Sequence, residues 1–210
     1  MNNFIRITTH MKLYRSKFEE VAQSLTPGVK SLLDIGCRDG KLKKFLPEGI
    51  EYAGIDLTPG PQVTKVCNAE SGIPYPDNTF DAIVALDMLE HTDDIWFVFG
   101  EFVRVARRQI MVVLPNSYHW KARLRFLRGK EGDKYKLPPE PIEDRHRWLT
   151  SYDASHDFAL HMASKYGLRL TESIAVDERR NFLREKFARV FSPNFMSIAV
   201  FLTFEKPSAG

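Results

Sequence analysis

The sequence predicts an α/β fold in which a mostly parallel sheet is covered by helices on both faces. Strand-like apolar runs alternate with segments of helical periodicity along the 210 residues, and this alternation is typical of parallel sheets. The run from Ile83 to Leu86 is apolar at every position, which favours a strand buried on both faces. With 43% hydrophobic and 27% charged residues, the chain has globular proportions.

Seven apolar runs predict the strands of this sheet. Several of them end at Gly, Pro or Asn, residues that interrupt strands. Right-handed crossovers between parallel strands would place a ligand at the carboxyl ends of the central strands. The predicted strands lie at 29–35, 52–56, 63–66, 80–86, 110–114, 168–176 and 196–204.

Helical spacing of apolar residues predicts the elements between the strands. The first helix is expected over 11–25. The clearest helix is expected over 95–106, with two acidic residues suited to its amino terminus and Arg107 and Arg108 suited to its carboxyl terminus. The other helices are expected at 41–46, 153–166 and 178–191.

Composition and charge argue against several classes of protein. The chain has no run of about 20 apolar residues for a membrane span and no secretory signal at its start, and two cysteines cannot form a disulfide framework. We therefore expect a cytoplasmic protein. The net charge of +3 divides into an acidic segment, 51–102, and a basic one, 103–136, and it is too small to predict nucleic-acid binding.

A glycine-containing loop follows the first predicted strand. Gly36 and Gly40 would let the backbone turn sharply there and approach a ligand closely. About twenty residues further on, the second predicted strand ends in Asp56, whose carboxylate suits the hydroxyl groups of a ribose. The dinucleotide-binding fingerprint would need glycine where the chain has Arg38 and Lys41, so a nicotinamide-dependent enzyme is the weaker interpretation.

Four segments together resemble class I S-adenosylmethionine (SAM)-dependent methyltransferases. The residues from Asp34 to Gly40 are similar to the first motif of that family, and those from Gly54 to Asp56 to its second. Asn68 to Asp81 and Asp87 to His91 are similar to its third region and to the segment after its fourth strand. The resemblance implies a Rossmann-like fold with seven strands, the last of them antiparallel, and SAM as the cofactor.

The resemblance also implies a set of cofactor-binding residues. Asp56 would bind the ribose hydroxyls, Asn68 would accept a hydrogen bond from the adenine amine, and the glycine loop would hold the amino-acid end of SAM. Arg38 stands where the family usually has glycine, and three roles stay open for it: pairing with the SAM carboxylate, extending into solvent, or obstructing the pocket. The full set is Asp34, Gly36, Cys37, Arg38, Gly40, Asp56, Leu57, Asn68, Ala69, Leu86, Asp87 and Met88.

Three histidines are the candidate catalytic residues. Methyl transfer needs an aligned acceptor, and an oxygen or nitrogen nucleophile can also need a base. His146, His91 and His119 are candidates because each lies near a strand end or in the segment 117–150. A lone histidine is more often structural, which is the competing interpretation for each of them. The sequence predicts no metal site.

Residues 117–150 interrupt the alternation of strands and helices, and we interpret them as a lid-like insertion. Within it, 120–136 is basic, and Trp120, Leu124 and Leu127 would share one face of a helix. Its cations are either solvated or in contact with an anionic acceptor, an acidic protein or a membrane surface. The chain is then one domain, 1–210, with a cofactor-binding core (11–116), the insertion (117–150) and a part that completes the sheet (151–210).

The segment from Arg107 to Lys130, with His146 beyond it, is also similar to MetW-type proteins of methionine biosynthesis. That family has the methyltransferase fold and is linked to the homoserine O-acyltransferase step as a partner. The first expected function is therefore SAM-dependent methyl transfer, on oxygen, to a small-molecule, glycan or lipid acceptor. The alternative is a MetW-like protein that binds and regulates the acyltransferase.

Overall fold

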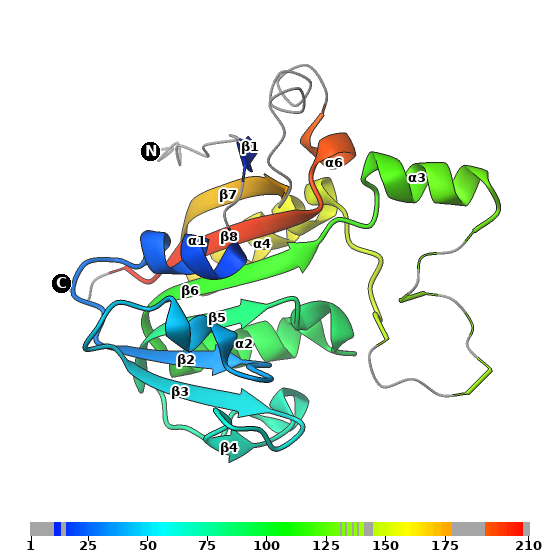
Figure 1. The fold of residues 1–210 in the computed structure, drawn as a ribbon. Coiled ribbons are helices and arrows are strands. Elements are labelled where there is room, and N and C mark those ends of the chain that lie inside the picture. Colours follow the sequence, from blue (N-terminus) through cyan, green and yellow to red (C-terminus); the bar gives the residue numbers. More distant parts are fainter. Residues whose placement is uncertain are drawn as a thin grey trace.

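The computed structural model describes residues 11–13, 16–130, 132, 134–135, 137, 139–140, 145–177 and 192–207. These residues form an eight-stranded sheet with the order β1-β7-β8-β6-β5-β2-β3-β4 (Figure 1). The strands are β1 (Met11–Leu13), β2 (Ser31–Ile35), β3 (Glu51–Asp56), β4 (Lys65–Val66), β5 (Phe80–Leu86), β6 (Ala106–Pro115), β7 (Arg169–Asp177) and β8 (Ala199–Glu205).

All seven predicted strands are present. β8 pairs antiparallel with both of its neighbours, β6 and β7, and the remaining pairs of the sheet are parallel. A mostly parallel sheet with an antiparallel last strand is the arrangement that the resemblance to class I methyltransferases implies. The predicted fold class is confirmed.

Helices lie between the strands, as the alternation predicts. The described α-helices are α1 (Lys17–Ser24), α2 (Ile95–Val105), α3 (Trp120–Leu127), α4 (Tyr152–Tyr166) and α6 (Pro193–Met196). Three short 3₁₀ helices also occur: η1 (Lys41–Lys44), η2 (Ala69–Ser71) and η3 (Leu89–His91). None of the helices in the described part of the chain is long and apolar enough to cross a membrane.

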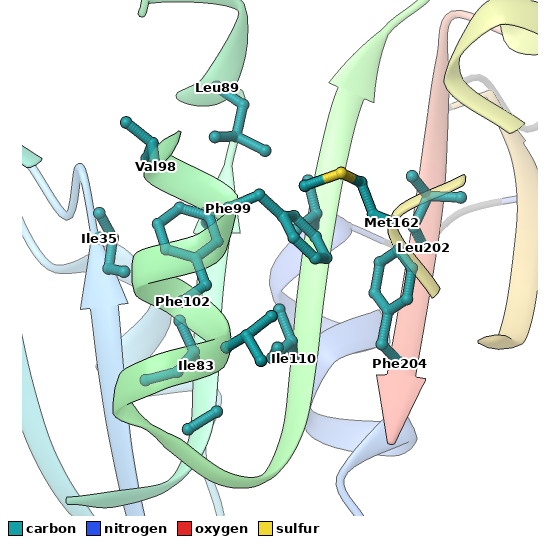
Figure 2. Close-up of a cluster of buried hydrophobic side chains, with 14 of the residues drawn as sticks. Ile35, Ile83, Leu89, Val98, Phe99, Phe102, Ile110, Met162, Leu202 and Phe204 are labelled. Atoms are coloured by element: carbon teal, nitrogen blue, oxygen red, sulfur yellow. The ribbon is translucent and has the colours of Figure 1, made fainter. Parts of the chain in front are cut away.

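Two apolar clusters cover the two faces of the sheet. On one face, Phe99 and Phe102 of α2 and Met162 of α4 pack against strand residues such as Ile83 (Figure 2). Successive residues of a strand point to opposite faces, so Val84 lies in the second cluster, with residues of α1 and η1. The double coverage buries the central strands and leaves their carboxyl ends to form a site.

The first element differs from the prediction of one helix over 11–25. The helix begins only at Lys17, because the Ser16 side chain accepts a hydrogen bond from the backbone N–H of Glu19 and caps it. Residues Met11–Leu13 instead pair in parallel with β7 and form an edge strand. Apolar spacing cannot reveal this strand, since its pairing partner lies more than 150 residues further along the chain.

Two other boundaries are corrected. Arg107 and Arg108 belong to β6 and not to the end of the preceding helix, because β6 begins at Ala106, paired with Phe80. The helix expected over 41–46 is the 3₁₀ helix Lys41–Lys44. The basic helix expected over 178–191 lies outside the described residues.

The predicted insertion contains α3, which extends away from the sheet in Figure 1. The helix over Trp120–Leu127 agrees with the helical face expected there, and none of its residues is buried. The insertion returns to the sheet at 145–148, where the backbone N–H of Arg147 donates to the carbonyl of Glu90 (2.7 Å). The indole of Trp148 donates to the carbonyl of Thr92 (2.8 Å). These contacts hold the end of the insertion against η3.

Candidate active site

Two adjoining cavities lie at the carboxyl ends of β2, β3 and β5, where ligands bind in open α/β sheets. The Asp56 cavity (≈ 260 Å³) is lined mainly by residues that follow β3, β4 and β5. The histidine cavity (≈ 490 Å³) is lined by residues from α1, the insertion and the ends of β2, β5, β6, β7 and β8 that meet at this edge of the sheet. Gly36, Arg38, Asp87 and His91 line both cavities, so they mark the boundary between them.

Eleven of the twelve predicted cofactor-binding residues line one or both cavities, and Gly40 lines neither. Those in the Asp56 cavity are Gly36, Arg38, Asp56, Leu57, Asn68, Ala69, Asp87 and Met88. Those in the histidine cavity are Asp34, Gly36, Cys37, Arg38, Leu86 and Asp87. The structure therefore brings the predicted set together, and the role of each residue toward a cofactor stays a prediction.

The loop after β2 depends on its glycines. Gly36 has a φ of 72°, and a Cβ atom added there would lie 2.8 Å from Cγ of Met88. Gly40 has a φ of 65°, and a Cβ atom there would lie 2.3 Å from Cβ of Gln62. Both positions combine a left-handed backbone with close packing, so side chains are excluded from them. Gly40 shapes the loop from outside the cavities.

Asp56 holds the two loops together. Its Oδ2 accepts a hydrogen bond from the backbone N–H of Arg38 (2.8 Å), and its Oδ1 accepts from the backbone N–H of Thr58 (3.2 Å). The Thr58 hydroxyl group also donates to Oδ1 (3.3 Å), so about one of the four lone-pair positions of the carboxylate remains for a ribose hydroxyl group. Arg38 itself has a φ of 50°, the conformation that glycine adopts more readily.

Asn68 and Glu70 lie on the wall of the Asp56 cavity. The Oδ1 atom of Asn68 accepts a hydrogen bond from the backbone N–H of Glu70 (2.9 Å) and caps η2. Glu70 in turn accepts from the backbone N–H of Asp93 (2.6 Å) and thereby connects η2 to the segment before α2. Glu70 is absent from the predicted site, although its position two residues after Asn68 in the third motif could have indicated it.

Asp34 is buried at the wall of the histidine cavity, with an exposed fraction of 4%. The hydroxyl group of Tyr52 donates a hydrogen bond to its Oδ2 (2.8 Å). Burial raises the pKa of Asp34 from 3.8 to about 7, against the opposing effects of this hydrogen bond and of the Lys17 charge. Asp34 thus has two protonation states accessible near neutral pH.

Lys17 and Phe18 bring α1 into the histidine cavity, a contribution that the sequence does not predict. The Lys17 ammonium group forms an ion pair with Asp87. Asp87 has a φ of 52°, so its backbone is strained at the end of β5. The missed residues come from a helix that is distant in sequence, and only the packing of α1 on the sheet places them here.

His91 and His146 meet in the histidine cavity, with their ring centroids 4.7 Å apart and their planes perpendicular. Burial lowers the pKa of His91 and lowers that of His146 to about 4, so both rings are neutral at pH 7. Glu90 lies beside them, fully buried, and burial raises its pKa from 4.5 to about 8. His119 precedes α3 and lines neither cavity, so the structure does not place it with the other two.

A family model described as "Methionine biosynthesis protein MetW" matches residues 15–203. The chain belongs to the MetW family. The match begins before α1 and extends into β8, so it includes the cavities and the insertion alike. The partial resemblance to MetW-type proteins is confirmed over nearly the whole chain.

Curated relatives of this chain are methyltransferases by name. It is 30% identical over 105 residues to an uncharacterized methyltransferase of Mycobacterium sp. (strain JLS), covering 45% of the chain and 42% of the relative. It is 29% identical over 162 residues to a ubiquinone biosynthesis O-methyltransferase of Bradyrhizobium sp. (strain ORS 278), covering 70% of the chain and 62% of the relative. The chain therefore spans less than two thirds of the length of these relatives.

Solved structures of methyltransferases share the fold of this chain. A SAM-dependent methyltransferase from Aquifex aeolicus superposes with a TM-score of 0.54 at 18% identity, covering 90% of the chain and 89% of that protein. Magnesium protoporphyrin IX methyltransferase from Synechocystis PCC 6803, solved with bound SAH, gives 0.56 at 15% identity, covering 89% and 78%. At these identities the likeness concerns the fold alone, and it shows that this chain has the class I methyltransferase fold.

Proposed function

We propose that this MetW-family protein is a SAM-dependent methyltransferase. It would bind SAM in the Asp56 cavity and an oxygen acceptor of a small molecule, glycan or lipid in the histidine cavity. The observation that carries the proposal is the junction of the two cavities at Gly36, Arg38, Asp87 and His91. A donor and an acceptor bound on either side of this junction would meet at the carboxyl end of the sheet.

The residues of the Asp56 cavity fit the parts of SAM. Asp56 has acceptor capacity left for one ribose hydroxyl group, and for the second if the Thr58 hydroxyl group turns away. The exposed side chain of Leu57, together with Ala69, would lie against the adenine ring. The tight loop at Gly36 admits the amino-acid end of the cofactor. SAM, when bound, supplies a methyl group on a positively charged sulfur, and the acidic lining residues suit that charge.

The histidine cavity fits an acceptor that must lose a proton. A base has to be unprotonated before it acts, and burial keeps the rings of His91 and His146 neutral at pH 7. The name of the Bradyrhizobium relative, a ubiquinone biosynthesis O-methyltransferase, supports oxygen as the acceptor atom.

Calorimetric titration with S-adenosylhomocysteine (SAH), with NAD as the control ligand, tests the cofactor assignment. We expect micromolar binding of SAH and none of NAD. Asp56→Ala should abolish SAH binding, whereas Asp157→Ala, which removes an exposed carboxylate of α4, should leave it unchanged. Absence of SAH binding by the folded wild-type protein would refute the proposal.

Family membership and the surface of α3 favour a second candidate, a partner of a homoserine O-acyltransferase. Leu127 of α3 is 84% exposed, and Phe126 beside it is 49% exposed. Under this proposal α3 docks on the acyltransferase. Co-purification of the two proteins tests it, and Leu127→Asp should abolish the complex, whereas Asp56→Ala should not affect it. Retained co-purification with Leu127→Asp would exclude α3 as the contact.

A further inference from the structure

Glu90, His91 and His146 place three potential metal ligands around one point at the wall of the histidine cavity. The Nε2 atoms of His91 and of His146 each lie 3.9 Å from Oε1 of Glu90. All three ligand atoms lie within 4.8 Å of one another. Ligands bound to one metal at about 2.1 Å are separated by roughly 3.0–3.4 Å, so closure of the site needs shifts of about an ångström.

The hydrogen bonds behind the rings indicate which nitrogen of each histidine faces Glu90. Nδ1 of His91 faces the carbonyl oxygen of Arg145 at 3.1 Å. A carbonyl can only accept, so this nitrogen carries the proton, and Nε2 presents its lone pair toward Glu90.

The same conclusion holds for His146 by one further step. The hydroxyl group of Tyr135 donates its single proton to the carbonyl of Trp148 (2.6 Å). Nδ1 of His146, 3.1 Å from that hydroxyl oxygen, must therefore donate to it. Nε2 of His146 is left with its lone pair toward Glu90. A metal-binding histidine is held in this way, with its outer nitrogen donating to an oxygen.

Glu90 completes the set with a carboxyl oxygen, and the group would release its proton on binding a metal. Its side chain has no exposed surface, and neither carboxylate oxygen has a hydrogen-bond partner among the described residues. Buried carboxylates are ordinarily paired with hydrogen-bond donors or coordinate metals. A metal ion bound between the three ligand atoms would supply the partner that the Glu90 oxygens lack.

We propose that Glu90, His91 and His146 bind one divalent transition-metal ion. Two imidazole nitrogens and one carboxylate oxygen suit ions such as Zn²⁺ or Mn²⁺ better than Mg²⁺ or Ca²⁺, which prefer oxygen ligands. Three protein ligands leave at least one coordination position open. Because the site borders the histidine cavity, that position is available to an oxygen of the acceptor, and the metal, when bound, would activate that oxygen in place of the histidine bases.

Metal titration of the chelator-treated full-length chain tests the proposal without any assay of activity. Calorimetry with Zn²⁺ and with Mn²⁺ should show one site, and Mg²⁺ should show none. Glu90→Gln and His146→Gln should each weaken binding at least tenfold, and the control His156→Gln should leave it unchanged, because His156 lies outside the cluster and contacts Ser173. Tyr135→Phe removes the acceptor behind His146 and should weaken binding about 10–100-fold.

SAH binding, measured in the same samples, separates this proposal from the proposed function. Glu90 and His146 do not line the Asp56 cavity, so folded Glu90→Gln and His146→Gln variants should retain SAH binding. If Glu90→Gln does not fold, His146→Gln decides alone. The His146 side chain is 12% exposed whereas that of Glu90 is fully buried, so we expect its replacement to disturb the fold less. Failure of wild type to bind either transition metal, or unchanged binding by the folded variants, overturns the proposal.

Discussion

Asp34 shows how a single buried carboxyl group makes stability depend on pH. Its oxygen accepts from Tyr52, and burial raises its pKa to about 7. Between about pH 4 and about pH 7 the folded protein keeps this proton, whereas the unfolded chain has released it. The free energy of unfolding therefore falls as the pH rises through this window, because the native state binds more protons.

We expect Asp34→Asn to remove this part of the pH dependence. One pKa unit corresponds to about 1.4 kcal/mol, so the stability of the variant relative to wild type should rise by a few kcal/mol between about pH 4 and about pH 7. Urea denaturation of both proteins across this pH range measures the difference between their free energies of unfolding. The effects of the other titrating groups cancel in this difference because both proteins share them. Parallel curves for the two proteins would show that Asp34 titrates at its ordinary pKa.

Arg38 lines both cavities, and by the resemblance of its loop to the first class I methyltransferase motif it stands where that motif has glycine. We expect Arg38→Ala to weaken SAH binding about tenfold, through loss of a charge-assisted hydrogen bond to the carboxylate. Arg38→Gly should weaken it equally while relieving the left-handed backbone. Tighter binding by both variants would instead show that the side chain obstructs the pocket.

Helix α2 illustrates what the sequence can predict about an element and what it cannot. Its apolar spacing predicts the buried face, and Asp94 caps it by accepting from the backbone N–H of Phe97 (2.9 Å). The boundary with β6 is misplaced, because pairing with β5 extends the strand back to Ala106. Local apolar patterns predict whether a segment is a helix or a strand, and pairing with distant strands determines the residues at which it begins and ends.

Two of the three phenylalanines of α2 allow a matched test of its packing. Phe99 is fully buried and Phe97 is 45% exposed on the same helix. Phe99→Ala should lower the free energy of unfolding by about 3–5 kcal/mol, because it leaves a cavity in the core. Phe97→Ala should change it by less than about 0.5 kcal/mol. Equal effects, measured by urea denaturation, would contradict the packing described for α2.

The site, like the helices and strands, has a part that the sequence predicts and a part that depends on long-range contacts. Motif spacing predicts Asp56 and the glycine loop, since local backbone geometry positions them. The roles of Glu90 and Tyr135 beside the histidines could not be predicted, because they depend on the return of the insertion to η3. That contact joins residues more than 50 positions apart, and no pattern within either segment encodes it.

The molecule as a whole should be stabilised by its cofactor, because the proposed SAM-binding site takes residues from several strands of the sheet. At a SAH concentration of about 100 times the dissociation constant, mass action adds about 2.7 kcal/mol. For a chain of this size we expect an increase of about 5–10 °C in Tm. Thermal denaturation with SAH, with NAD and with Asp56→Ala checks this, and an equal shift in Asp56→Ala would show that the ribose site is misplaced.

The place of β8 in the sheet has a consequence for biosynthesis. β8 lies between β6 and β7, yet it is the last of the strands to leave the ribosome. At translation speeds of about 5–20 residues per second, on the order of ten seconds pass between the emergence of β6 and that of β8. During that delay the apolar edge of β6 lacks its partner, so the nascent chain is open to aggregation and to capture by chaperones until β8 inserts.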